Sequence, residues 1–318
     1  MTPALPRHGP APVESVARLV GATPLVRLRR IGAELPGIRI YGKCEFENPG
    51  GSVKDRPALR MIETALADGR LGGGRTLVDS TSGNTGVAYA WICAALGIPC
   101  ALVMPANVSA ARKRIARAFG AELVFSDPLE GSDGAIHKVR ALVEAEPDRW
   151  FYPDQYGNEE NPRAHEHGTA VEIAEALDGA VAAFAAGIGT GGTVMGTSRG
   201  LRRLAPGVRC HAVEPEEPLH GLEGLKHMAS SIVPAIYREA ELDGKISMPT
   251  AEGWAMAERL AREEGLRVGH SAGAAVAGAL ALARRMAEAG ERGNVVTVLP
   301  DRADRYVEPR SWERRTRW

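Results

Sequence analysis

The sequence predicts an α/β protein of two lobes, each built on a mostly parallel sheet with helices on both faces. Short apolar runs alternate with helix-length segments, which is typical of strand–helix–strand units. The alternation comes in two sets, separated by the segment 150–168 (WFYPDQYGNEENPRAHEHG), which is rich in Asn, Pro and aromatic residues and lacks periodicity. We therefore expect this segment to cross irregularly between the lobes, beside a crevice that binds a ligand.

The first set begins with a helix over 56–67. The elements expected after it are a strand over 76–79, a helix ending near 96, a strand over 100–104, a helix over 109–119, a strand over 122–126 and one more helix. The uncharged run 86–104 is long enough to raise the question of a membrane span. Gly97-Ile-Pro99 interrupts it, so a buried helix followed by a strand explains it better.

The second set follows the same rhythm after the crossing segment. Its expected elements are a strand over 181–186, a helix from 192, a strand over 208–213, helices near 252–264 and 272–290, and a strand over 294–299.

Composition argues against several classes of function. The 39 Lys and Arg balance the 39 Asp and Glu, so no net field favours nucleic acid or an anionic membrane. The four cysteines lie in apolar contexts without a C-x-x-C pair, which indicates reduced core thiols and no metal site; they are Cys44, Cys93, Cys100 and Cys210. The N-terminal MTPALPRHGPAPVE lacks the apolar core of a secretory signal, so we expect a cytoplasmic protein that acts on small molecules.

The stretch GIGTGGTVMG (187–196) follows an apolar run and predicts a phosphate-binding loop at a helix start. Its glycines fit the G-x-G-x-x-G fingerprint of dinucleotide sites, and Glu214 falls where the ribose-binding acid would lie. Thr190 and Thr193 add hydroxyls that suit a single phosphate monoester instead. By itself the stretch leaves three interpretations open: a dinucleotide site, a compact phosphate site and a turn without a ligand.

Lys54 stands in ENPGGSVKDRPA (47–58), at the turn that enters the first helix. A solvated lysine at a helix start is the commoner interpretation of such a position. In a cleft, however, a lysine whose pKa is lowered by burial can form a Schiff base with an aldehyde.

Two further polar stretches lie at expected helix starts. STSGNTG (80–86) offers more hydroxyl, amide and backbone donors than helix capping needs, which indicates a carboxylate site. GHSAGAA (269–275) places Ser271 where it could cap a helix or contact a ligand nitrogen. Together with Lys54 and the glycine-rich loop, these stretches specify an aldehyde-bearing phosphate ester joined to a lysine. Pyridoxal phosphate (PLP) fits that description, whereas NAD does not use the lysine.

The motifs resemble the cysteine synthase (O-acetylserine sulfhydrylase) family, which belongs to the fold type II PLP enzymes together with cystathionine β-synthase. The resemblance covers nearly the whole chain in the family's order, through GATPLVRL, NPGGSVKDRPA, TSGNTG, MPANVSAARKRIARAFGAEL, DQYGNEENP, GIGTGGTVMGTSRGL, GHSAGAAVAGAL and VVTVLPD. It implies a two-lobed fold with PLP in the crevice, a smaller mobile domain over 46–156, and a larger PLP-binding domain formed by 1–45 and 157–318.

The resemblance also implies the roles of site residues. Lys54 would be the catalytic residue, holding PLP as a Schiff base and later removing the substrate α-proton. Ser271 would contact the pyridine nitrogen, where a neutral hydroxyl gives a weaker electron sink than a carboxylate and suits β-elimination. Asn84 would lie near the ring hydroxyl of PLP, and the phosphate would be bound by Gly189, Thr190, Gly191, Gly192 and Thr193. The substrate carboxylate would be bound by Thr81, Ser82, Asn84, Thr85 and Gln155.

The implied reaction is a β-replacement that makes L-cysteine from O-acetyl-L-serine, or O-phospho-L-serine, and sulfide through an α-aminoacrylate. A homodimer is expected, with a serine acetyltransferase or a sulfur-carrier protein as candidate partner. Cystathionine β-synthase and serine or threonine dehydratase activities stay open, whereas the intact Lys54 and SGNTG argue against a non-catalytic regulator.

Donor choice rests on HGLEGLKHM (220–228), which lies where relatives set substrate specificity. Lys226 there suits a phosphate leaving group, and His227 could add to it at low pH, although a solvated lysine explains Lys226 equally well. Three positions depart from the family pattern: Ala22 replaces Asn, Ala170-Val171 replaces Gly-Pro, and Asp79-Ser80 replaces Glu-Pro. The role of the basic C-terminal tail, RSWERRTRW, is left open.

Overall fold

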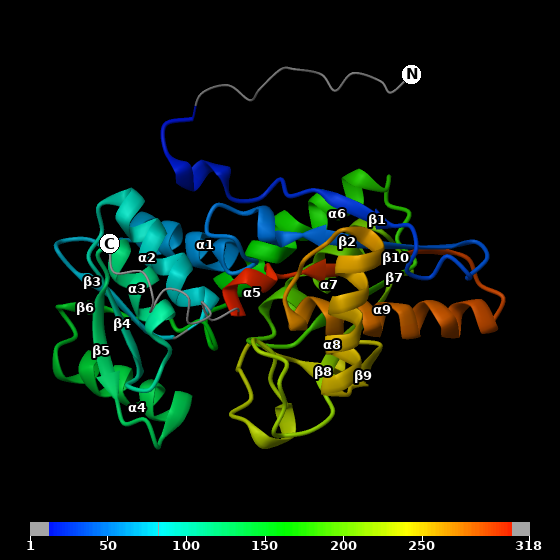
Figure 1. The fold of residues 1–318 in the computed structure, drawn as a ribbon. Coiled ribbons are helices and arrows are strands. Elements are labelled where there is room, and N and C mark those ends of the chain that lie inside the picture. Colours follow the sequence, from blue (N-terminus) through cyan, green and yellow to red (C-terminus); the bar gives the residue numbers. More distant parts are fainter. Residues whose placement is uncertain (1–12, 82, 307–318) are drawn as a thin grey trace, which may run out of the picture.

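A computed structural model describes residues 13–81 and 83–306 of the chain. Two lobes lie side by side, each built around its own sheet (Figure 1). Ser82 and the C-terminal tail, both singled out above, lie outside the described residues. The α/β architecture with two mostly parallel sheets agrees with the fold class that the sequence predicts.

The larger sheet has six strands, in the spatial order β1-β2-β10-β7-β8-β9. The β1–β2 pair is antiparallel and the other pairs are parallel. The last strand in the sequence lies near the centre of the sheet, and its run of buried β-branched residues suits that place. The strands are β1 (Leu25–Leu28), β2 (Ile38–Cys44), β7 (Ala183–Gly187), β8 (Arg209–Pro215), β9 (Gly244–Met248) and β10 (Gly293–Leu299).

Helices cover both faces of this sheet. On one face α9 packs on the central strands with α8 behind it, and on the other α7 packs with the short helices that precede β7. These elements are α5 (Glu160–Ala164), the π-helical turn η3 (His165–Thr169), α6 (Ala170–Ala176), α7 (Gly192–Leu204), α8 (Thr250–Arg259), the π-helical turn η6 (Leu260–Glu264) and α9 (His270–Glu288).

The smaller sheet contains four parallel strands in the order β5-β4-β3-β6. Its strands are β3 (Thr76–Ser80), β4 (Cys100–Pro105), β5 (Glu122–Ser126) and β6 (Trp150–Phe151), and its helices are α1 (Asp55–Ala67), α2 (Asn84–Leu96), α3 (Ala110–Ala118) and α4 (Gly131–Ala145). All four strands come from the range 46–156, and the boundaries of the two domains stay a prediction.

The uncharged run 86–104 is divided as expected. Helix α2 ends at Leu96, Gly97 adopts a left-handed conformation with φ of 69°, and β4 begins at Cys100. Among the described helices, none is both long and apolar enough to cross a membrane.

The expectation for the segment 150–168 is wrong in one respect. We expected an irregular crossing, but the segment contains β6, α5 and most of η3. Helix α5 packs against both α1 and α7, so contacts with distant helices stabilise a helix that the local sequence does not predict.

Further short 3₁₀-helices are η1 (Val16–Leu19), η2 (Glu45–Glu47), η4 (Met228–Ser230), η5 (Glu239–Glu241) and η7 (Ala303–Tyr306).

A buried cluster of charges joins β2, η2, α1 and α6. Arg56 pairs with Glu45 and with Glu172 at 2.7 Å each, and Lys43 pairs with Glu172 at 2.6 Å. Glu172 also accepts a hydrogen bond from the backbone N–H of Ala22, at 3.0 Å. The cluster fixes α1, and therefore the turn before it, against the larger sheet.

Candidate active site

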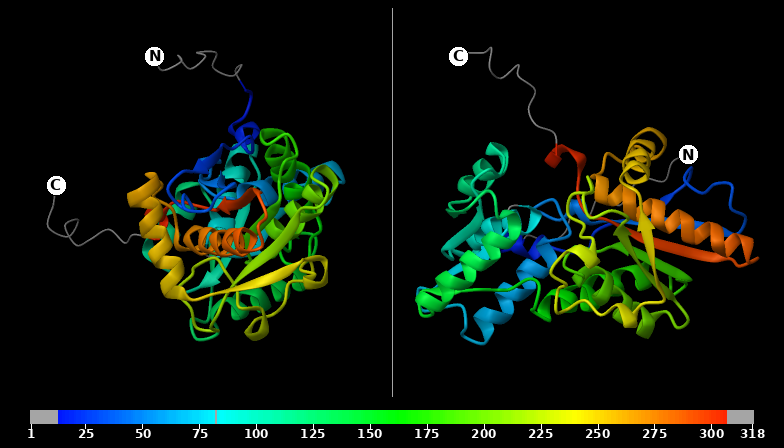
Figure 2. Two further views of the ribbon diagram at one scale, coloured as in Figure 1. Left: turned by 90° about the vertical axis from the view of Figure 1, so that its right-hand side faces the viewer. Right: turned by 90° about the horizontal axis from the view of Figure 1, so that it is seen from below.

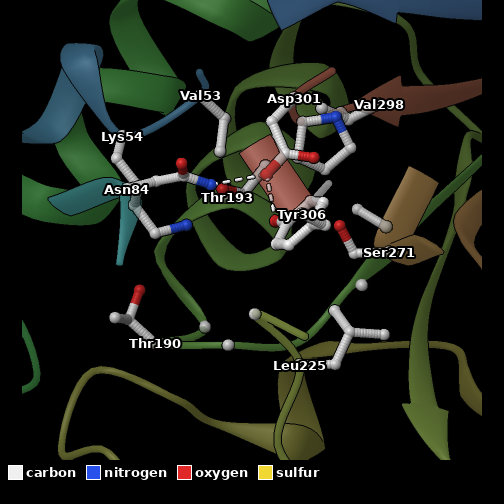
Figure 3. A pocket seen from close by; sticks show the side chains of 16 residues that line it. Val53, Lys54, Asn84, Thr190, Thr193, Leu225, Ser271, Val298, Asp301 and Tyr306 are labelled. Carbon is white, nitrogen blue, oxygen red and sulfur yellow. Dashed lines mark hydrogen bonds between the residues drawn. The ribbon is translucent and has the colours of Figure 1, made fainter. Parts of the chain in front are cut away.

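The carboxyl ends of β3, β7 and β10 converge where the two lobes meet, and the loops that follow these strands line two adjoining cavities. The larger cavity has a volume of about 470 Å³ and the smaller about 40 Å³. Figure 3 shows the smaller one, with Lys54 and Asn84 at one side and Ser271 at another. The turn η7 lies between the lobes beside this site (Figures 1 and 2).

Lys54 immediately precedes α1 and lines both cavities. Burial lowers the pKa of its amine, and the nearby carboxylate of Asp301 opposes that shift. In the described part of the chain, no salt bridge includes Lys54. The solvated interpretation of Lys54 is therefore excluded, because its side chain forms part of the cavity wall and its amine deprotonates more readily than that of an exposed lysine.

The glycine-rich loop lies at the N-terminus of α7, where backbone N–H groups favour an anion. A Cβ on Gly189 would lie 2.5 Å from the carbonyl oxygen of Gly224, and one on Gly192 would lie 1.9 Å from Oδ1 of Asn161. Gly191 has a φ of 88°, which disfavours any other residue. Thr190 and Thr193 line the smaller cavity together with Gly189 and Gly191, whereas Gly192 packs behind the loop on Asn161. The loop forms a compact cradle of a size that suits one phosphate.

Glu214, the candidate ribose-binding acid of a dinucleotide site, is engaged elsewhere. It is buried at the end of β8, where it pairs with Lys245 at 2.7 Å and accepts a hydrogen bond from the backbone N–H of Met228. Neither cavity is lined by Glu214. Apart from the glycines, Glu214 was the residue that favoured a dinucleotide site, and its position does not support that interpretation.

Thr81 and Thr85, in the loop 81–86, lie at the larger cavity together with Gln155, and the binding of a carboxylate there stays a prediction. Thr85 Oγ1 donates to Gln155 Oε1 at 2.9 Å, and Thr81 Oγ1 accepts from the backbone N–H of Gly86 at 3.1 Å. Thr81, Thr85 and Gln155 all line this cavity. The N-terminus of α2 begins in the same loop, so the environment favours a carboxylate.

Three site residues were not singled out from the sequence: Asp301, Arg305 and Tyr306. Oδ2 of Asp301 accepts hydrogen bonds from Asn84 Nδ2, at 2.5 Å, and from the Tyr306 hydroxyl (Figure 3). Arg305 Nη1 donates to Asn84 Oδ1 at 2.9 Å. Asp301 lies two residues after the end of β10, so the rule that ligand-binding residues follow parallel strands could have found it. Arg305 and Tyr306 carry no comparable signal.

Ser271 is the second residue of α9 and lines the smaller cavity, with 4% of its surface exposed.

Lys226 lines the larger cavity, and its Nζ lies 4.8 Å from the ring centroid of Tyr156. Burial lowers the pKa of Lys226, and Asp133 opposes that shift. Lys226 is therefore half-buried at the cavity, and its role toward a leaving group stays a prediction. His227 bonds to Ser230 and does not line either cavity.

Comparison with known sequences decides the family. The sequence profile described as "pyridoxal-phosphate dependent enzyme" matches residues 16–301. The chain belongs to this family. The cysteine synthase of Aquifex aeolicus is 48% identical over 296 residues, which cover 92% of this chain and 90% of that protein.

Solved structures agree with the family assignment. The cysteine synthase of Entamoeba histolytica superposes with a TM-score of 0.90 at 33% identity, covering 98% of this chain and 94% of that one. The O-acetylserine-dependent cystathionine β-synthase of Helicobacter pylori gives a TM-score of 0.85 at 34% identity, covering 95% of this chain and 99% of that one. This PLP-dependent enzyme therefore has the fold type II architecture that the resemblance implied.

The residues at the site fit PLP. The glycine-rich loop has no space for Cβ atoms at Gly189 and Gly192, and it suits the phosphate of PLP. Beside it lie Lys54, whose lowered pKa suits the aldehyde, and the buried Ser271, which suits the pyridine nitrogen. Within residues 13–81 and 83–306, no three His, Cys, Asp or Glu side chains lie together as metal ligands would.

Proposed function

We propose that this PLP-dependent enzyme is a cysteine synthase, which forms L-cysteine from O-acetyl-L-serine and sulfide. The observation that carries the proposal is the position of Lys54, whose amine lines the cavity between the phosphate cradle and the carboxylate loop. The similarity to cysteine synthases over nearly the whole chain supports the same activity.

In this proposal PLP supplies an electron sink that lets the substrate lose its α-proton and its β-substituent. Lys54 holds the cofactor covalently and, because burial lowers its pKa, its amine can accept the α-proton once the substrate has replaced it. Ser271, which lines the smaller cavity, would hold the pyridine nitrogen without adding a negative charge, and Asn84 would donate to the ring hydroxyl.

The other proposed contacts hold the two ends of the reacting complex. Gly189, Thr190, Gly191, Gly192 and Thr193 form the phosphate cradle, with Gly192 supporting it from behind. Thr81, Ser82, Asn84, Thr85 and Gln155 bind the substrate carboxylate at the start of α2. Because Lys54 lines both the cavity of the phosphate cradle and the cavity of the carboxylate loop, binding of both groups would hold the α-carbon near its amine.

We propose that Lys226 determines which leaving group the enzyme prefers. It lines the larger cavity as a half-buried cation over Tyr156, and none of the described salt bridges includes it. A cation there stabilises a departing phosphate more than a departing acetate, because the phosphate has the larger charge. Lys226→Ala is expected to lower kcat/KM for O-phosphoserine by roughly tenfold or more and to affect O-acetylserine much less. Equal losses on both donors would contradict this role.

Cystathionine formation is the second candidate function. The larger cavity, at about 470 Å³, offers more room than sulfide requires, and one similar structure is named as an O-acetylserine-dependent cystathionine β-synthase. Homocysteine could therefore serve as the second substrate in place of sulfide.

One experiment separates these activities. The purified enzyme is supplied with O-acetylserine, O-phosphoserine or serine, each with sulfide or with homocysteine, and the products are identified by mass spectrometry. Cysteine from O-acetylserine and sulfide is the expected main product; cystathionine as the main product would replace the first function by the second. Borohydride treatment should fix the cofactor to Lys54 in a peptide map, and the Lys54→Ala variant is the control. A colourless protein with no product from any pair would refute both functions.

We also propose a cytoplasmic homodimer. All four cysteines are free and buried, which supports a reducing compartment. Sedimentation of the purified protein tests the dimer, and a serine acetyltransferase or a sulfur-carrier protein stays a predicted partner.

A further inference from the structure

Arg305 links three segments that meet at the site. It lies in η7, lines the larger cavity, and is half-buried. Nη1 of its guanidinium donates to Asn84 Oδ1 at 2.9 Å, while Nη2 donates to the carbonyl oxygen of Gly50, in the turn that leads to Lys54. The chain thus returns at its 301–306 segment to join the loop that carries Lys54 with the loop that carries Asn84.

The turn at Gly50 is shaped to receive this guanidinium. A Cβ on Gly51, whose φ is 75°, would lie 2.6 Å from Arg305 Nη2, so a larger residue would displace the arginine. On its other side the turn is held by Asp55, whose carboxylate accepts a hydrogen bond from the N–H of Gly50 at 2.6 Å. Arg305 and Asp55 therefore hold Gly50 from its carbonyl and its amide sides.

The hydrogen bonds around Asn84 allow one orientation of its amide. Oδ1 faces the guanidinium of Arg305, and Nδ2 faces the carboxylate of Asp301. A flipped amide would place N–H groups against a cation and an oxygen against a carboxylate, so both contacts would become repulsive. Nδ2 has two hydrogens; Asp301 accepts one of them, and the other is directed to the Tyr306 hydroxyl or to a ligand in the cavity.

The charge of Arg305 supports the same arrangement at Asp301. Burial raises the pKa of this carboxyl group, which is 1% exposed, whereas Tyr306, Asn84 and the positive charge of Arg305 lower it. An ionised Asp301 can only accept hydrogen bonds and so keeps Nδ2 of Asn84 as the donor.

We propose that Arg305 is a positioning residue that fixes the Asn84 amide with Nδ2 toward the PLP site and holds the Lys54 turn against it. The inference rests on the proposed function only in placing PLP at this site. Arg305 would act through Asn84 and Gly50 and not through contact with the reacting atoms. A guanidinium suits this task because its planar fork donates in two fixed directions, which an ammonium group does not.

The test measures PLP binding to the apoprotein and the visible absorption spectrum of the bound cofactor. Arg305→Met is expected to raise the dissociation constant of PLP by about tenfold or more, because a charge-assisted contact that orients a ligand donor is lost. Arg305→Lys keeps the charge but not the fork and should recover only part of the affinity. Arg302→Met is the matched control, since Arg302 pairs with Glu47 on the surface and lines neither cavity.

A double-mutant cycle distinguishes positioning from general stabilisation. In the Asn84→Ala background, Arg305→Met should change PLP affinity clearly less than in the parent enzyme, because only the contact with Gly50 is left to lose. The proposal would be overturned if Arg305→Met had the same PLP affinity and absorption spectrum as Arg302→Met. It would also be overturned if the effects of Asn84→Ala and Arg305→Met on the free energy of PLP binding were fully additive. If Arg305→Met does not fold, Arg305→Lys is measured in the same cycle against the same criteria. A parent enzyme that binds PLP but makes no cysteine would refute the proposed function and leave this test intact.

Discussion

Replacing Gly192 with alanine is expected to damage both the stability of the protein and its affinity for PLP. The new Cβ would lie 1.9 Å from Oδ1 and 2.6 Å from Cγ of Asn161, far inside any normal contact, so the Asn161 side chain must move. Asn161 is 2% exposed, and its Nδ2 donates to the carbonyl oxygen of Gln155 at 2.6 Å and to Thr190 Oγ1 at 3.1 Å. Both hydrogen bonds break if it moves.

The magnitude follows from these contacts. Overpacking a filled site costs about 1–3 kcal/mol, and each lost hydrogen bond adds about 0.5–1.5 kcal/mol. The free energy of unfolding should therefore fall by about 3 kcal/mol, which corresponds to a decrease in Tm of roughly 4–5 °C for a protein of this size. Since Thr190 and Gln155 line the cavities, PLP affinity should fall as well, by about tenfold.

The assay is thermal unfolding of the apoprotein, together with titration by PLP. Gly72→Ala is the matched control, because a Cβ there meets no atom within 4 Å and the φ of Gly72 is not in the left-handed region. That control should be neutral or slightly stabilising. If Gly192→Ala keeps the Tm and the PLP affinity of Gly72→Ala, the argument from close packing behind the cradle is refuted.

Three further predictions concern stability. Burial would raise the pKa of Glu172, but the hydrogen bonds and charges of Arg56 and Lys43 lower it from 4.5 to about 2. The ionised Glu172 therefore stabilises the folded protein above pH 4.5, by at most about 3 kcal/mol, and this stabilisation is lost as the pH falls toward 2. Glu172→Gln should therefore lower the midpoint of urea unfolding at pH 7. In the variant this midpoint should also fall less than in the parent between pH 4.5 and pH 2, and an equal fall would contradict the prediction. Burial raises the pKa of Asp79 from 3.8 to about 7, although its carboxyl group accepts a hydrogen bond from the backbone N–H of Ser80 at 2.7 Å. The stability that the neutral carboxyl group gives below pH 4 is therefore lost as the pH rises through 7. Asp79→Asn should raise Tm at pH 8.5 but not at pH 4, and equal changes at both would count against a neutral buried carboxyl. Ala22 has a φ of 46°, so Ala22→Gly should raise the free energy of unfolding by about 1 kcal/mol in urea titrations, whereas a loss would show that the strain is absent.

Local sequence determined much of the fold. The strands β3, β4, β5, β7, β8 and β10 form close to the predicted ranges. Apart from the edge strand β5, most of their residues are buried, and buried parallel strands favour apolar runs of this length. The same reasoning located the loops of the site, since parallel strands bring their carboxyl ends to one edge. Thr81, Asn84, Thr190 and Thr193 therefore line the cavities as the order of strands and loops predicts.

Strands β1, β2, β6 and β9 were not predicted from the sequence, nor was helix α5. The short β1 and β6 and the alternately exposed β9 show weak apolar patterns, and they gain order by pairing with neighbouring strands. The partner of β6, β3, is distant in the sequence. Helix α5 has only five residues, too few to be stable alone, and it forms where α1 and α7 pack against it.

Which distant side chains complete the site was decided by the tertiary structure. Arg305 reaches Gly50 across 255 positions of the sequence and Asn84 across 221, and no periodicity of nearby residues records such a contact. The same holds for Asn161 behind Gly192 and for Lys226 over Tyr156. Periodicity reports which face of an element is buried, because burial repeats with the turn of a helix or the pleat of a strand. Which distant partner meets a side chain depends on how the elements pack, and that information exists only once the chain is folded.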